Sequence, residues 1–123
     1  MIAWFGEAEK GAYHTPYPIA SLDELVATFG HPPKYSHGLF YAVQTLLYNK
    51  PLLFFRVEEE GFSLDDYLIG LRTIHSINTI SAIGMPGMAH THIIEEIMPK
   101  LILHHQILLF NEKDLYDYIT ALR

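Results

Sequence analysis

Short apolar runs alternate along this chain with longer segments in which apolar residues recur every three or four positions. The uninterrupted runs predict buried strands at residues 2–5, 52–57, 77–83 and 107–110. The amphipathic segments predict helices that begin near Ser21, Ser36, Ser63, Thr91 and Asn111. Ser21 and Glu24 have the spacing of a capping box, as do Ser63 and Asp66.

The periodic positions of each predicted helix are expected to face the core. In the second helix this apolar stripe contains Leu39, Phe40, Val43, Leu46 and Leu47. Pro99 lies inside the fourth helix, which we expect to cover 91–103, and a proline there predicts a kink or a split into two helices.

The order of these elements predicts the fold class. Strands that are apolar throughout and separated by helices are typical of an α/β protein, with a mainly parallel sheet and helices on both faces. Residues 15–20 carry Pro16 and Pro18, which remove backbone donors, so this stretch leaves room for one mixed edge strand. The 123 residues contain no repeat or linker and predict a single α/β domain over 1–123.

Charge and composition exclude several classes of function. The chain has eight Lys and Arg against fourteen Asp and Glu, a formal net charge of −6, and no basic cluster. Nucleic acid and anionic membrane surfaces are therefore not expected partners. No apolar run approaches the ~20 residues that span a bilayer, and the first residues lack a basic leader, so no signal peptide is expected and the expected location is the cytoplasm. The absence of cysteine excludes disulfides and thiolate sites.

A ligand site, if present, would lie where the parallel strands end. The residues at these ends that could bind a small ligand or nucleotide are Gly6, Glu7, Gly11, Arg56, Gly84 and Gly87. Their spacing is not that of a dinucleotide-binding loop, and no phosphate-loop lysine motif occurs. Glycines that allow tight turns explain the same pattern. We expect Arg56 to reach a carboxylate, and the run 58–60 of three glutamates to be a solvated turn.

Histidines and acids near residue 90 raise the possibility of a metal site made of His90, His92 and Glu96. Helical spacing places His92 and Glu96 on one face, whereas zinc needs three or four converging ligands. A solvated helix start is the alternative that we prefer, and His104 and His105 are expected at the surface. No nucleophile, base and orienting group are spaced as a catalytic set, so the pattern favours neither an enzyme nor a cofactor.

Several short motifs follow one another along the chain. They are the turn at 5–11, the Thr-Pro step and extended run at 14–21, the helix that closes on Phe29-Gly30, the strand that ends in Arg56-Val57, and the run 77–87 that ends in Pro-Gly. The order of these motifs resembles that of contractile phage tail sheath proteins. This resemblance implies a homo-oligomeric structural protein of a phage tail or contractile injection machine, without catalysis or cofactor.

The chain departs from the family pattern, because sheath proteins are several times longer and carry an inserted outer domain and terminal arms that exchange strands. The resemblance therefore implies a minimal sheath-like core, self-assembling or accessory, in the cytoplasm or in an assembled tail-like particle. The alternative hypothesis is a Rossmann-like domain that binds a small ligand or nucleotide, either as a binding protein or as an enzyme.

Overall fold

The computed structural model describes residues 1–77, 79–109 and 111–121 and contains a five-stranded sheet in the order β2-β3-β1-β4-β5. The central strand β1 (Ile2–Gly6) pairs in parallel with β3 (Leu52–Arg56) and with β4 (Ala82–Gly84). The edge strand β5 (Ile107–Leu109) is parallel to β4, and β2 (Pro16–Ile19) is antiparallel to β3 at the other edge. The predicted α/β class and mixed edge strand are confirmed.

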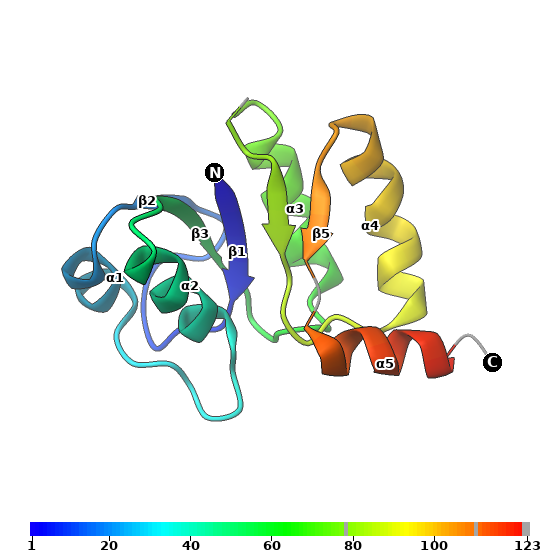
Figure 1. Cartoon of the computed structure of the whole chain (residues 1–123), viewed down its shortest axis with the longest axis horizontal. Coiled ribbons are helices and arrows are strands. Elements are labelled where there is room, and N and C mark those ends of the chain that lie inside the picture. The colour runs from blue at the N-terminus through cyan, green and yellow to red at the C-terminus, as the bar shows by residue number, and fades with distance from the viewer. Residues whose placement is uncertain (78, 110, 122–123) are drawn as a thin grey trace.

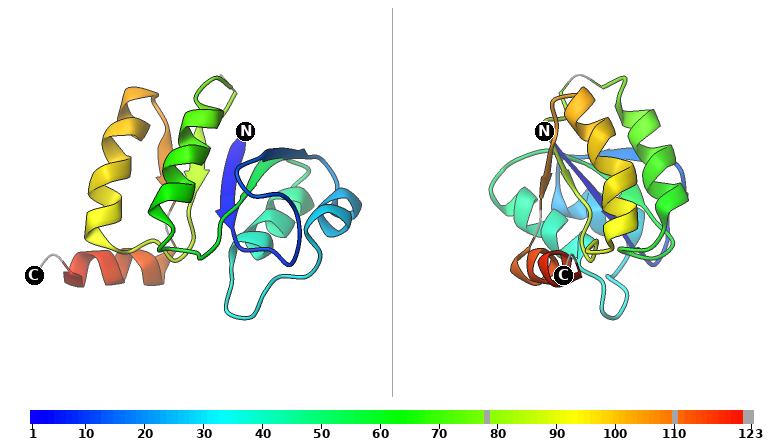
Figure 2. Two further views of the ribbon diagram at one scale, coloured as in Figure 1. Left: turned by 180° about the vertical axis from the view of Figure 1, so that it is seen from behind. Right: turned by 90° about the vertical axis from the view of Figure 1, so that its right-hand side faces the viewer.

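Helices cover the two faces of the sheet unequally. Helices α3 (Leu64–Ile74) and α4 (Thr91–Leu103) lie side by side on one face (Figure 2). Helices α1 (Leu22–Phe29) and α2 (Gly38–Leu47) pack on the other face, over β3 and β1. The last helix, α5 (Glu112–Ala121), begins beyond the carboxyl end of β5 and runs outward, away from the centre of the sheet (Figure 1). No helix in the described part of the chain lies over β4 and β5 on the α2 side.

Alternating strand residues divide the core between these two faces. Ala3, Phe5, Leu53 and Phe55 pack under α3 and α4, and the residues between them pack under α1 and α2. Gly70 lets α3 approach the sheet closely, because a Cβ there would overlap the ring of Phe5.

Several predicted helix boundaries are confirmed. Ser21 caps α1 and accepts from Glu24 N at 3.2 Å, and Asn111 Oδ1 accepts from Asp114 N at 2.7 Å. Helix α4 covers 91–103 as predicted and passes Pro99 without a break, so of the two predicted effects of this proline, a kink or a split, the split is wrong. Ser36 does not begin α2. Its hydroxyl donates to Pro33 O, and the helix starts two residues later at Gly38.

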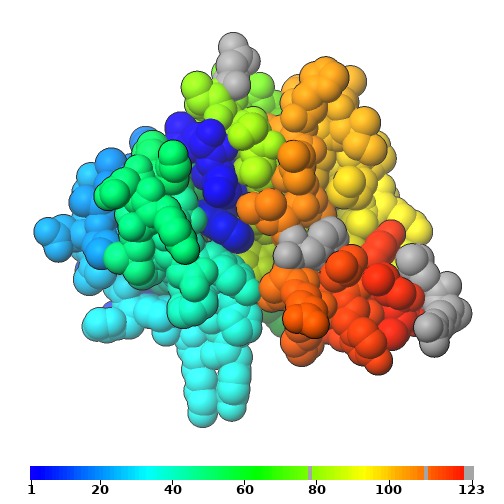
Figure 3. Space-filling model, viewed as in Figure 1, coloured from blue at the N-terminus to red at the C-terminus, as the bar shows by residue number. Residues whose placement is uncertain are grey.

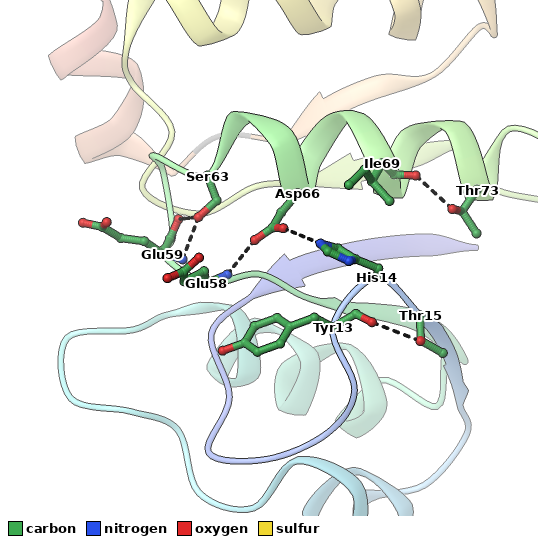
Figure 4. A network of polar contacts seen from close by, with 9 residues as sticks. All are labelled: Tyr13, His14, Thr15, Glu58, Glu59, Ser63, Asp66, Ile69 and Thr73. Atoms are coloured by element: carbon green, nitrogen blue, oxygen red, sulfur yellow. Dashed lines mark hydrogen bonds and ion pairs between the residues drawn. The ribbon is translucent and has the colours of Figure 1, made fainter.

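The start of α3 also differs from the predicted capping box (Figure 4). The Ser63 hydroxyl donates to Glu59 O at 2.9 Å instead of capping the helix. The Asp66 carboxylate accepts from Glu58 N at 2.8 Å and contacts His14 Nε2 at 2.9 Å. Asp66 therefore joins α3 to the loop after β3 and to the loop before β2.

Two predicted strands are shorter than expected. Of 77–83, only Ala82 and Ile83 are in a strand, which continues to Gly84, and residue 78 lies outside the described part. Of 107–110, residues 107–109 form β5 and residue 110 lies outside the described part.

Candidate functional site

The carboxyl ends of the parallel strands border a cleft of about 570 Å³. Of the residues predicted for a ligand site, only Glu7 and Gly87 line it. The lining contains four carboxylates, those of Glu7, Glu60, Asp114 and Asp117. The only Lys or Arg of this lining is Lys113, which pairs with Asp117 at 2.8 Å. A cleft with this balance of charge repels phosphate groups.

One of these carboxylates, that of Glu60, is bonded to the backbone of the chain itself. Its Oε1 accepts from His37 N at 2.8 Å, and its Oε2 accepts from Glu7 N at 2.8 Å and Gly38 N at 3.0 Å. Glu7 Oε2 in turn accepts from Glu60 N at 2.9 Å. His37 and Gly38 begin α2, so the carboxylate occupies the helix N-terminus at which a ligand anion would otherwise bind.

Burial governs the electrostatics of Glu60, which is 8% exposed. Desolvation, with a smaller contribution from the nearby charge of Glu7, raises the pKa of Glu60 against the three amide hydrogen bonds that lower it. The prediction of a solvated acidic turn is therefore wrong for Glu60, although Glu58 and Glu59 are exposed as expected.

Asp114 closes the other side of the cleft. Its Oδ2 accepts from Gly87 N at 3.0 Å, which joins α5 to the turn that follows β4. Burial raises the pKa of Asp114 despite this hydrogen bond. Gly87 has φ +79° and lies against Gly61, which has φ +88°. These two glycines shape turns, in agreement with the structural interpretation of the sequence.

Arg56 does not reach a carboxylate, so that prediction is wrong. Its guanidinium donates from Nη1 to Gly11 O at 2.6 Å and from Nη2 to Ala8 O at 3.0 Å. The ring of Tyr13 lies 4.2 Å from the guanidinium carbon. The long loop between β1 and β2 is thus folded around Arg56, whose two Nη atoms are occupied by the carbonyls of that loop.

The remaining predicted glycines serve packing. Gly6 faces Gly38, and a Cβ at Gly6 would lie 2.7 Å from Gly38 Cα, so α2 can approach β1 only with glycine there. Gly11 packs on the Phe29 ring with φ +106°. Gly84 lies beneath the indole of Trp4. The six residues thus do not form one ligand site.

The proposed metal ligands do not converge. The rings of His90 and His92 are 6.5 Å apart and nearly perpendicular. Among the residues that the structure describes, no three His, Asp or Glu side chains could hold a metal ion together.

Comparison with known proteins adds no relative. No protein-family profile, curated protein or solved structure matches this chain.

A surface that the predicted core positions did not reveal lies on the open half of the sheet. On α2, Phe40 is 54% exposed and Leu47 is 64% exposed, although the stripe placed both in the core. Tyr48, which follows α2, is 79% exposed, and Ile107 on β5 is 66% exposed. Ile107 and Leu109 point to the same side of the sheet as α2. We name Phe40, Leu47, Tyr48, Ile107 and Leu109 the α2–β5 face.

The α2–β5 face has a ridge and a trough. Helix α2 forms the ridge, and the strands β1, β4 and β5 are visible beside it as the floor of the trough (Figure 3). Trp4 borders this floor: its ring lies over Gly84, stacks on Tyr41 at 5.2 Å, and donates from Nε1 to Thr45 Oγ1 at 2.9 Å. Trp4 and Tyr41 line a hollow of about 180 Å³ together with Pro86 and Leu109.

One sequence signal pointed to this face. Helix α2 reads GLFYAVQTLL and has no charged residue, and a helix that is apolar all round is normally buried on all sides.

No helix in the described part of the chain is long and apolar enough to cross a membrane.

Proposed function

We propose that this chain is a structural protein that acts by self-assembly, and that two copies pair through the α2–β5 face. The observation that carries the proposal is an uncharged, exposed helix beside an uncovered half of a sheet. The resemblance to tail sheath cores supports the finer proposal, a minimal sheath-like component of a phage tail or contractile injection machine.

The shape of the face favours a second copy as its occupant. A two-fold interface requires a surface that is complementary to itself. A ridge next to a trough has this property, because α2 of each copy can lie on the β4–β5 floor of the other. Each copy would then supply the helix that covers the open half of its partner's sheet.

The area and charge of the face agree with such a pair. The exposed apolar area of the face is on the order of 500 Å², since a large side chain presents about 150–250 Å² when fully open. This area is the sum over Phe40, Leu47, Tyr48 and Ile107. A standard interface buries about 800 Å² on each partner, which this apolar centre and its margin can supply. Neither α2 nor β5 carries a charge, and Asp114, the carboxylate that lines the hollow beside Leu109, already accepts a hydrogen bond from Gly87 N.

The pairing can be tested by sedimentation velocity over a range of concentrations. We expect the wild-type chain to form dimers, and we expect Leu47→Asp or Ile107→Asp to weaken dimerisation at least tenfold because each buries a carboxylate. Higher salt should strengthen dimerisation, because it screens the repulsion between two chains of net charge −6.

Ile102→Asp is the matched control, because Ile102 is also 66% exposed but lies on α4, which covers the opposite face of the sheet. It should leave the dimer unchanged. A wild-type chain that stays monomeric at high concentration, or a control that dissociates the dimer equally well, would contradict the proposed pairing. Electron microscopy of the concentrated protein tests the finer proposal, which predicts ordered assemblies larger than a dimer.

A further inference from the structure

A basic pocket lies between the carboxyl-terminal parts of α3 and α4, on the side of the molecule away from the acidic cleft at the carboxyl ends of the strands. Its cavity of about 250 Å³ is lined by Leu68, Arg72, His75, Lys100, Leu103 and His104. The lining contains no carboxylate. In a chain with fourteen acidic residues against eight Lys and Arg, this gathering of four basic side chains is a local reversal of charge.

The two permanent cations of the pocket are not used elsewhere. Within the described ranges, neither Arg72 nor Lys100 forms an ion pair or a side-chain hydrogen bond. By contrast, Arg56 is bonded to two carbonyls and Lys113 to Asp117. The guanidinium and the ammonium are therefore available to a ligand.

The two imidazoles are stacked on each other. The ring centroids of His75 and His104 are 3.6 Å apart, and the planes are inclined by 21°. His75 Nε2 is buried, and neither it nor the nearby Gln106 Oε1 has a hydrogen bond of good geometry within the described residues. Burial, followed by the charges of His104 and Lys100, lowers the pKa of His75, and contact with Gln106 opposes this shift. An anion bound in the pocket would oppose the effect of these two positive charges and so raise the pKa of His75.

Two simpler explanations account for only part of this arrangement. A cation in the last turn of a helix stabilises the helix dipole, which would explain Arg72 on α3 and Lys100 on α4 separately. It does not explain why four basic groups from two helices meet around one cavity without an acid. Two stacked imidazoles also cannot direct their in-plane lone pairs at one metal ion.

From this geometry we propose that the pocket binds a phosphate group, free or as a small phosphomonoester. The guanidinium of Arg72 would donate to two phosphate oxygens, Lys100 would supply a second charge, and the imidazoles would donate once protonated. Leu68 and Leu103 would contact the apolar part of an ester. This site is independent of the proposed assembly, since it lies on the helices that cover the other face.

Titration of the histidine resonances by NMR tests the site at low ionic strength near pH 6. Inorganic phosphate should shift the resonances of His75 and His104 saturably and raise the pKa of His75. Phenyl phosphate should bind more tightly than inorganic phosphate if the leucines contact an ester, and equally well if the pocket recognises the phosphate alone.

Two double variants distinguish phosphate binding in this pocket from a general attraction of phosphate to positive charge on the protein. Arg72→Gln with Lys100→Gln should weaken phosphate binding at least tenfold. Lys10→Gln with Lys50→Gln removes the same charge from exposed positions outside the pocket and should change binding less than twofold. Unsaturable shifts in the wild-type chain, or equal weakening by both double variants, would overturn the proposal.

Discussion

Replacing Glu60 with alanine should destabilise the fold by about 3–5 kcal/mol, because a buried donor left without its acceptor costs about 1–3 kcal/mol. The substitution leaves the amides of Glu7, His37 and Gly38 without their acceptor. The loss should be smaller than three full penalties, since burial of the carboxylate is itself unfavourable, as its raised pKa indicates. Denaturant titration followed by circular dichroism measures the change in free energy of unfolding.

Glu59→Ala is the control for this experiment. Glu59 lies in the same turn and carries the same charge, but its side chain is exposed, so its replacement should change stability by less than about 0.5 kcal/mol. Glu60→Gln should give an intermediate loss, because its amide nitrogen must face at least one of the three donors. Equal effects of Glu59→Ala and Glu60→Ala would mean that the three hydrogen bonds contribute nothing to stability.

Local patterns in the sequence were sufficient to predict the elements of the fold. The apolar runs located β1 and β3, the two prolines located the edge strand β2, and the limits of α4 were predicted to the residue. These features depend on neighbours a few positions away, and Ser21 and Asn111 cap their helices for the same reason. The mainly parallel sheet followed from the alternation of strands and helices.

Features that depend on distant parts of the chain were not predictable. Glu60 sits in a run of three glutamates that looks solvated, and only the fold brings it to the start of α2. Arg56 was expected to find a carboxylate, because nothing local shows that the carbonyls of Gly11 and Ala8 surround it. Phe40 and Leu47 fit a core stripe by periodicity, yet they are exposed. The side of α2 that packs on the sheet carries Leu39, Ala42 and Leu46 instead, so the other two residues point away from it.

Gly61 and Gly87 are constrained in two ways, by a positive φ and by the space available for a Cβ. The shortage of space has the larger expected effect, and it concerns Gly61. Gly61 and Gly87 have similar dihedral angles, φ +88° and +79°, so an alanine at either position is strained by about 1–2 kcal/mol. A Cβ on Gly61 would in addition overlap the carbonyl of Gly87, whereas a Cβ on Gly87 would meet nothing nearer than 3.4 Å. The two positions therefore differ in available space and hardly at all in φ.

We expect Gly61→Ala to cost about 3 kcal/mol or more, and Gly87→Ala only the 1–2 kcal/mol of strain. The turn that holds Gly87 cannot easily retreat, because Asp114 accepts from its amide at 3.0 Å and fixes it to α5. Thermal unfolding of both variants measures the difference, which isolates the overlap of the two backbones. Equal losses would show that the turn after β4 yields freely to the added methyl group.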